Sequence, residues 1–129
     1  MPYMQHLKVM VADDTSVSRM LLVDSLSQIG IKNVTLAGDG EQALKSLMAS
    51  PCHIVFSDFN MLKLDGLQLL RALREYGLTR QTVFILVTGK GDRALIEAGR
   101  KFGLNNFLLK PFTVEGLKTC IEAVVGKLV

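Results

Sequence analysis

The stretch VFILVT at residues 83–88 is an almost uninterrupted apolar run with the length of one β-strand. Runs of similar length recur at residues 7–12 (LKVMVA), 34–37 (VTLA), 53–57 (HIVFS) and 106–110 (NFLLK). Most of them are nearly continuous in apolar residues and do not alternate with polar ones. Strands read in this way when helices cover both faces of a parallel sheet. We therefore predict five buried, parallel strands.

The segments between these runs have the pattern of helices. We expect helices at residues 15–29, 40–49, 65–76, 91–102 and 113–128. Gly30, Gly77 and Gly103 follow three of them and are predicted C-caps. Regular alternation of strand and helix with short connections predicts an α/β fold, a (βα)5 doubly wound five-stranded parallel sheet with right-handed crossovers.

The predicted third helix is amphipathic. Leucines at helical spacing mark its core face, at positions 67, 69, 70 and 73. Arg71, Arg74 and Glu75 fall on the opposite side, which we expect to face solvent.

Length and composition restrict the class of protein. At 129 residues and 14.2 kDa, we expect one domain spanning residues 1–129 with no effector domain attached. Hydrophobic residues make up 49% of the chain, yet no apolar run approaches the roughly 18 residues that span a bilayer. The N-terminus lacks the pattern of a signal peptide, so we expect a cytoplasmic location and no membrane association.

Charge and cysteine content exclude further classes. The formal net charge is +3, but Lys and Arg are interleaved with acidic residues, so we do not expect nucleic-acid binding. Cys52 and Cys120 lie far apart within predicted elements, and we interpret both as free thiols in the interior.

Polar residues stand where the predicted strands end. Asp13 and Asp14 follow the first strand, Asp58 the third, Thr88 the fourth, and Lys110 the fifth. The carboxyl ends of parallel strands share one edge of the sheet, where ligands bind in open α/β folds. We therefore expect all five side chains at one site. Taken alone, Asp14 or Thr15 is readily explained as a helix N-cap, but a cap does not account for Asp13.

Three carboxylates at one edge require a cation. At separations of ~4 to 5 Å each pair repels by roughly 3 to 4 kcal/mol at an effective dielectric of 20. A site of oxygen ligands without His or Cys favours Mg²⁺. With Lys110 aimed at the carboxylates and Thr88 as a hydrogen-bond donor, the set favours phosphoryl transfer to an aspartate, and Asp58 is the best nucleophile.

Five short stretches, in this order and at these strand ends, resemble the CheY-like receiver domains of two-component signalling over essentially the whole chain. They are VADD (11–14), SDFNM (57–61), LDG (64–66), VTG (87–89) and KPF (110–112). The resemblance implies the flavodoxin-like strand order 2-1-3-4-5. It also implies that the Lys110–Pro111 peptide is cis.

The resemblance assigns roles at the site. It implies that Asp58 accepts the phosphoryl group and that Asp14, Asp58 and the backbone carbonyl of Asn60 bind Mg²⁺, with Asp13 acting through a coordinated water. Thr88 and Lys110 are implied to contact the phosphoryl oxygens. Phe107 matches the switch aromatic that turns inward as Thr88 moves, although it also reads as an ordinary core residue.

Further features follow from the same resemblance. Asn60 and Lys90 stand where the family tunes hydrolysis of the acyl phosphate. Leu62 replaces a usual Pro and is expected to leave the loop after Asp58 less restrained. The implied output surface covers the fourth helix, fifth strand and fifth helix, with Arg93, Ile96, Phe107, Leu109 and Lys118 as candidates.

The implied function is that of a monomeric, stand-alone response regulator in chemotaxis. It would catalyse its own phosphorylation and dephosphorylation without being a conventional enzyme. The implied phosphodonor is the chemotaxis histidine kinase, and the output is binding to the flagellar motor switch protein. The alternatives are a phosphate sink that returns phosphoryl groups to the kinase complex, and a degenerate receiver used only for docking.

Two other classes fit the residues less well. A haloacid-dehalogenase-type phosphohydrolase would need an Asp-x-Asp pair after the first strand, whereas Asp13 and Asp14 are adjacent. A flavodoxin-like redox protein would need a hydroxyl- and glycine-rich phosphate loop where this chain has two carboxylates.

Overall fold

The computed structural model describes residues 6–89 and 93–126. Its strands are β1 (Lys8–Ala12), β2 (Asn33–Ala37), β3 (Ile54–Asp58), β4 (Val83–Gly89) and β5 (Asn106–Lys110). Its helices are α1 (Ser16–Ile29), α2 (Gly40–Ala49), α3 (Gly66–Glu75), α4 (Arg93–Lys101) and α5 (Val114–Val125). Strand and helix alternate along the chain as predicted. The predicted first residues of α4 and last residues of α5 lie partly outside the described residues.

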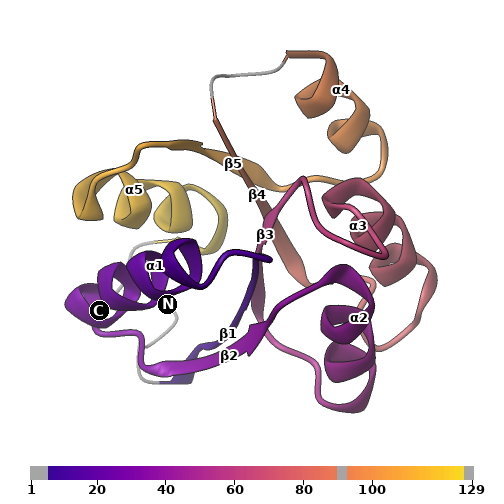
Figure 1. The fold of residues 1–129 in the computed structure, drawn as a ribbon, viewed down its shortest axis with the longest axis horizontal. Helices are drawn as coiled ribbons and strands as arrows, with labels where there is room; N and C mark the ends of the chain where they lie inside the picture. Colours follow the sequence, from indigo (N-terminus) through magenta and orange to yellow (C-terminus); the bar gives the residue numbers. More distant parts are fainter. Residues whose placement is uncertain (1–5, 90–92, 127–129) are drawn as a thin grey trace.

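The five strands form one parallel sheet in the order β2-β1-β3-β4-β5, as the resemblance implied. Helices α1 and α5 lie side by side on one face, and α2 and α3 cover the other, with α4 next to α3 (Figure 1). In the central strand β3, Val55 pairs with Met10 of β1 and Phe84 of β4. This register places the ends of β1, β3 and β4 next to one another.

The hydrophobic core has two halves, one on each face of the sheet. Phe56 of β3 packs with Leu26 of α1 and Leu117 of α5. Its neighbour Val55 points to the other face, toward Leu70 of α3. All five side chains have no solvent-exposed area. Successive side chains of a strand point to opposite faces of the sheet. Because both faces are buried, the side chains on each must be apolar, which explains the continuous apolar runs.

Helix ends follow the glycine pattern in two of three cases. Gly30 (φ 110°) and Gly103 (φ 88°) adopt the left-handed conformation after α1 and α4. The prediction for Gly77 was wrong, because Tyr76 is the C-cap residue of α3 and has an extended backbone. The buried hydroxyl of Thr79 donates to the carbonyls of Leu73 and Tyr76. The Thr79 side chain thus provides a hydrogen-bond donor for the backbone carbonyls at the end of α3, and no left-handed glycine is needed there.

The side chains of α3 depart from the prediction at one position. Leu69, Leu70 and Leu73 are fully buried, and Arg71 is exposed, as expected. Arg74 is half-buried, because its guanidinium reaches backbone carbonyls on the loops that flank β4 and β5.

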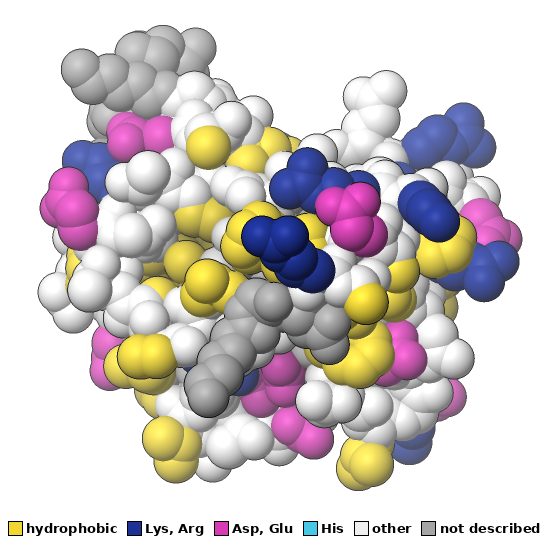
Figure 2. Space-filling model, turned by 90° about the horizontal axis from the view of Figure 1, so that it is seen from above, with side chains coloured by type: hydrophobic (Ala, Val, Ile, Leu, Met, Phe, Trp, Pro, Cys, Tyr) yellow, Lys and Arg dark blue, Asp and Glu magenta, His cyan; other side chains and the backbone are white. Residues whose placement is uncertain are grey.

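Both cysteines are buried and free, as predicted. Burial raises the pKa of the Cys120 thiol to about 11, so this thiol is neutral at ordinary pH. In residues 6–89 and 93–126, no helix combines the length and apolar character needed to cross a membrane. On the face drawn in Figure 2, basic and acidic side chains are intermingled, as the interleaved sequence indicated.

Candidate functional site

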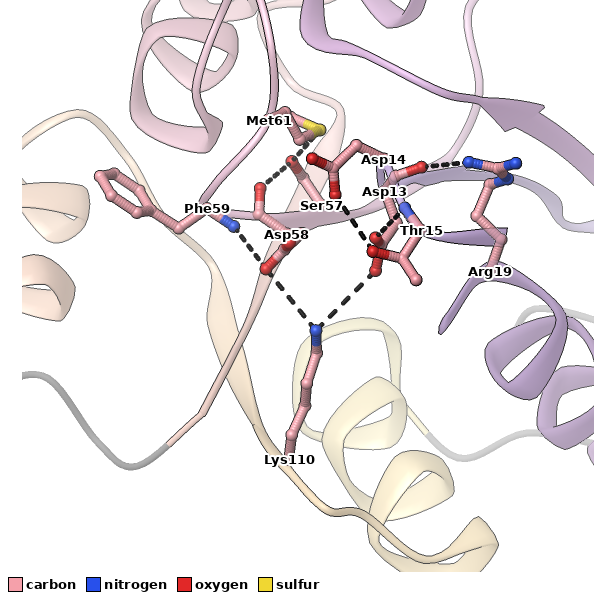
Figure 3. Close-up of polar contacts among 9 residues, drawn as sticks. All are labelled: Asp13, Asp14, Thr15, Arg19, Ser57, Asp58, Phe59, Met61 and Lys110. Atoms are coloured by element: carbon pink, nitrogen blue, oxygen red, sulfur yellow. Dashed lines mark hydrogen bonds and ion pairs between the residues drawn. The ribbon is translucent and has the colours of Figure 1, made fainter. Parts of the chain in front are cut away.

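The three aspartates predicted at the strand ends lie together. Asp13 and Asp14 follow β1, and Asp58 is the last residue of β3 (Figure 3). Each offers a carboxylate oxygen, and these oxygens lie within 4.8 Å of one another. Asp13 is buried, Asp58 is half-buried and Asp14 is exposed. The cluster therefore spans the boundary between the core and the solvent.

Lys110 supplies the positive charge that the sequence predicted. Its Nζ lies 3.6 Å from Oδ1 of Asp58 and 3.8 Å from Oδ2 of Asp13 (Figure 3). The side chain leaves the end of β5, and the following Lys110–Pro111 peptide is cis, as implied. Among the described residues, Lys110 forms ion pairs with two of the three carboxylates, so the cluster keeps an excess of negative charge.

Three hydrogen bonds hold Asp13, two through its backbone and one through its carboxylate. Its N–H donates to the carbonyl of Ala37 on β2 (3.1 Å), and its Oδ1 accepts the N–H of Thr15 (2.9 Å). Its carbonyl accepts a hydrogen bond from Nη1 of Arg19 (2.6 Å). The sequence did not indicate Arg19, because an arginine in the second turn of a helix usually reads as a surface residue. These bonds fix the direction of the Asp13 carboxylate.

The N-cap explanation for Asp14 or Thr15 is confirmed only in the backbone position of Thr15, and not in a capping side chain. Thr15 occupies the N-cap position of α1, but its side chain makes no capping hydrogen bond. Its hydroxyl instead donates to Oδ1 of Asp14 (3.3 Å). Thr15 thus binds two members of the acid cluster: its N–H donates to Asp13, and its hydroxyl donates to Asp14.

Asp58 sits in an environment that disfavours its charge. Burial raises the pKa of its carboxyl, and the charges of Asp13 and Asp14 raise it further. Lys110 and the N–H of Phe59, which donates to Oδ1 at 2.9 Å, act in the opposite direction. The net pKa is raised, so an added cation would stabilise the charged form.

Glycine is required at the start of α3 by a close approach. A Cβ on Gly66 would lie 2.7 Å from the backbone oxygen of Asp58 and 3.0 Å from Leu86. The N–H of Gly66 also donates to the carbonyl of Phe59 (2.8 Å). The glycine of the LDG stretch therefore lets the first turn of α3 pack directly against the backbone of Asp58.

The loop after Asp58 is attached to α2. The carbonyl of Leu62 accepts the N–H of Gly40 (3.3 Å) and of Leu64 (2.8 Å). Between them Lys63 has a positive φ of 72°, which is unusual for a residue with a side chain. Leu62 is exposed. The loop without the usual Pro is thus hydrogen-bonded to the start of the neighbouring helix α2.

The remaining predicted site residues lie on β4, on β5 and in the loop after β3. Thr88, near the end of β4, is buried, and its hydroxyl donates to the carbonyl of Gly89 (3.3 Å). Phe107 on β5 is half-buried against the core half that contains α2 and α3. Asn60 is exposed in the loop two residues after Asp58. Lys90 lies outside the described residues.

The implied output surface needs one correction. Arg93, Leu109 and Lys118 are exposed. Ile96 is buried, because it lies with Gly99 on the inner side of α4. It cannot contact a partner without a movement of this helix.

The sequence matches a known protein family and a relative within the chemotaxis proteins. The family model described as "Response regulator receiver domain" matches residues 9–122. The chain is 48% identical over 124 residues to the probable chemotaxis protein CheY of Rhizobium etli, covering 96% of each chain.

Solved structures of similar proteins share this fold. The chemotaxis protein CheY4 of Vibrio cholerae superposes with a TM-score of 0.85 at 26% identity, covering 92% of this chain and 98% of that one. The receiver domain of the sensor histidine kinase PA1611 from Pseudomonas aeruginosa has a TM-score of 0.84 at 25% identity. That match covers 94% of this chain and 98% of that one, and the structure has a magnesium ion coordinated in its active-site cleft.

Proposed function

The chain belongs to the response regulator receiver family and is of the CheY type, and we propose that it is a chemotaxis phosphorylation switch whose phosphoacceptor is Asp58. The observation that carries the proposal is the convergence of three carboxylates and Lys110 at the ends of β1, β3 and β5. Proteins of this family are signalling proteins and not conventional enzymes.

The acid cluster fits Mg²⁺. Its donors are oxygens only, they lie within 4.8 Å of one another, and one lysine does not balance their charge. Asp13, Asp14, Asp58 and the backbone carbonyl of Asn60 would hold the ion. When bound, Mg²⁺ would neutralise charge on the phosphoryl oxygens.

The residues of the chain would then perform the transfer. One Oδ of Asp58 attacks the phosphorus of the donor, and the bond from phosphorus to the leaving group breaks. Lys110 already lies 3.6 Å from Oδ1 of Asp58 and would contact a phosphoryl oxygen. The Thr88 hydroxyl would exchange its bond to the Gly89 carbonyl for one to the phosphoryl group.

The switch would follow from that exchange. When Thr88 moves toward the phosphoryl group, it leaves space beside β5 into which the half-buried ring of Phe107 can turn. This movement would change the surface formed by α4, β5 and α5. We propose a chemotaxis histidine kinase as the phosphodonor and a protein, such as the flagellar motor switch protein, as the reader of that surface.

A small phosphodonor tests the central claim. Acetyl phosphate with Mg²⁺ should add one phosphoryl group, detected by mass spectrometry and removed by hydroxylamine, and EDTA should prevent the reaction. Asp58→Asn should abolish it. Asp24→Asn, at an exposed position on α1, is the matched control and should react normally. An adduct that survives Asp58→Asn, or full labelling in EDTA, would overturn the assignment.

A binding experiment separates motor output from a phosphate sink. The phosphorylated protein is incubated with the motor switch protein and, separately, with the kinase, and each is captured. Binding to the switch protein that depends on phosphorylation supports motor output. Binding to the kinase alone would favour the sink.

A further inference from the structure

The sheet has two edge strands, and the proposed function involves only one of them. Strand β5 belongs to the implied output surface. Strand β2 (Asn33–Ala37) lies at the opposite edge and pairs on one side only, with β1 (Figure 1). An edge strand presents backbone N–H and C=O groups along its free side, and natural proteins commonly protect it with charged residues, proline or a bulge.

Residues 33–37 carry none of these three protections. Their sequence, NVTLA, includes no charged residue and no proline. The pairing with β1 runs over all five residues without a bulge. Leu36 is 43% exposed, and Asn33 and Thr35 are exposed as well. The free side of β2 is therefore a regular and neutral strand edge.

The hydrogen bonds of β2 indicate which backbone groups point outward. The carbonyl of Ala37 accepts the N–H of Asp13 (3.1 Å), so Ala37 faces β1. Successive residues of a strand direct their backbone polar groups to alternate sides, so Val34 and Leu36 face outward. The N–H of Val34 turns back to the carbonyl of Lys32 (3.1 Å). The edge therefore offers the N–H of Leu36 as a donor and the carbonyl of Val34 as an acceptor.

A strand that fits this edge must supply the matching carbonyl and N–H, and β2 of a second copy does so. In an antiparallel pair centred on Thr35, Leu36 of each copy lies opposite Val34 of the other. Each Leu36 N–H can then donate to the facing Val34 carbonyl, which gives two hydrogen bonds by symmetry. Thr35 lies opposite its own counterpart.

The side chains of β2 match in the same arrangement. Val34 packs against the core half that contains α1, and Leu36, two residues later, lies on the same face of the sheet. The exposed part of each Leu36 would be covered by Val34 of the other copy. On the opposite face the two Thr35 side chains would meet, and Thr–Thr pairs across neighbouring strands are favourable.

Charges beyond the two ends of β2 are complementary as well. Lys32 precedes the strand and is exposed. Asp39 follows it by two residues, where its carboxylate accepts the N–H of Gln42. The antiparallel arrangement brings Lys32 of one copy beside Gly38 and Asp39 of the other. Opposite charges are then neighbours at both ends of the pair, which favours association.

We propose that β2 is a self-association edge, through which two copies of the chain join their five-stranded sheets around a two-fold axis at Thr35. The contact uses the free edge of β2 in both copies, so association stops at the dimer. It includes no residue of the acid cluster and does not depend on the role of Asp58. The proposal departs from the monomer that the resemblance implies.

Sedimentation equilibrium of the full chain over a concentration series tests the proposal. The wild-type mass should rise from 14.2 kDa toward twice that value as the concentration approaches about 1 mM, the range of weak protein contacts. Thr35→Lys and Thr35→Glu each place two like charges directly opposite each other. Each should raise the dissociation constant of the dimer by about fivefold.

An equal mixture of the two variants provides the sharpest comparison. The lysine of one variant then faces the glutamate of the other, so the mixture should associate at least as tightly as the wild type. Circular dichroism checks that each variant is folded. Thr119→Lys, at an exposed threonine on α5, adds the same charge away from β2 and is the matched control. It should keep the wild-type dissociation constant.

Three results would each overturn the proposal. The wild-type protein could remain at 14.2 kDa at every concentration. The two single variants could associate as the wild type does, which would place the contact elsewhere. The mixture could fail to regain the association that each variant lost. Labelling of Asp58 is measured independently, so its failure would not affect this contact.

Discussion

At the scale of single residues, the site depends on how its charges are balanced. Three carboxylates share one edge of the sheet, and Lys110 is the cation that contacts two of them among the described residues. Burial and the neighbouring acids raise the pKa of Asp58 despite this lysine. The metal-free protein therefore disfavours the ionised form of Asp58, and a bound cation would relieve this.

The raised pKa has a consequence for stability. The folded protein binds the Asp58 proton more tightly than the unfolded chain, so the associated stability is complete below the ordinary carboxyl pKa. It is lost as the pH rises through the higher folded-state pKa. At neutral pH the ionised Asp58 is thus a cost to the metal-free protein.

Replacement by a neutral isostere should remove that cost. We expect Asp58→Asn to raise the free energy of unfolding at pH 7 in EDTA by on the order of 1 kcal/mol. Urea denaturation followed by circular dichroism measures the change. The difference between the two proteins should shrink when the pH is lowered below the ordinary carboxyl range. A less stable Asp58→Asn protein would show that the Lys110 attraction outweighs burial and repulsion.

At the scale of elements, contacts between residues distant in sequence hold the loops at the carboxyl ends of the strands, where the acid cluster lies. The start of α2 is pressed against the loop after β3, where Gly40 donates to the carbonyl of Leu62. A Cβ on Gly40 would overlap the backbone carbonyl oxygen of Leu64. Backbone cannot yield as a flexible side chain can, so this contact requires glycine.

Gly40→Ala should therefore destabilise the protein, although alanine is the better helix former. We expect a loss of about 2 to 3 kcal/mol, measured by urea denaturation, because the helix and the loop must separate. Gly77→Ala is the control, since a Cβ there meets nothing within 4 Å, and its effect should stay within about 0.5 kcal/mol. Equal effects in the two variants would rule out this explanation.

Helix α3 is tied to the opposite end of the sheet by Arg74. Its guanidinium donates four hydrogen bonds of 2.8 to 2.9 Å, to the carbonyls of Arg80, Thr82 and Gly103 and to Oδ1 of Asn105. These acceptors belong to the segments before β4 and between α4 and β5. Burial lowers the pKa of Arg74, which is a sign of the desolvation that these bonds offset.

Arg74→Met should cost about 2 to 3 kcal/mol of folding free energy, because it leaves several acceptors without their donor. Arg71→Met is a matched control one turn earlier. Its guanidinium lies 4.9 Å from the centre of the Phe102 ring and is exposed, so we expect a loss of less than about 1 kcal/mol. Thermal or urea denaturation distinguishes the two. Equal losses would mean that the four bonds contribute little.

At the scale of the whole molecule, an ion held by the acid cluster would couple binding to folding. Its carboxylates come from the ends of β1 and β3, which are far apart in sequence and meet only in the assembled sheet. An ion bound there is bound by the folded state alone. Mg²⁺ should therefore stabilise the entire protein and not only the site.

We expect the free energy of unfolding to rise with Mg²⁺ concentration, by about 2.7 kcal/mol when the ion is at one hundred times its dissociation constant. Differential scanning calorimetry measures the shift in Tm. Asp14→Asn should remove most of it, whereas Asp24→Asn on α1 should retain it. A shift that persists in Asp14→Asn would place the ion elsewhere.

Local patterns in the sequence were sufficient for the class of fold and for the members of the site. Continuous apolar runs identify strands buried on both faces, and parallel strands bring their carboxyl ends to one edge, so Asp13, Asp14, Asp58 and Lys110 had to meet. The strand order and the cis peptide before Pro111 came from the resemblance and not from the pattern.

Other features were decided only by the tertiary structure. They include the bond from Arg19 to Asp13, the anchoring of Arg74, the burial of Ile96, and the Thr79 side chain that ends α3 in place of Gly77. The physical reason is common to all of them. Periodicity reports which side of an element faces the core, but these contacts depend on which elements pack together and at what distance.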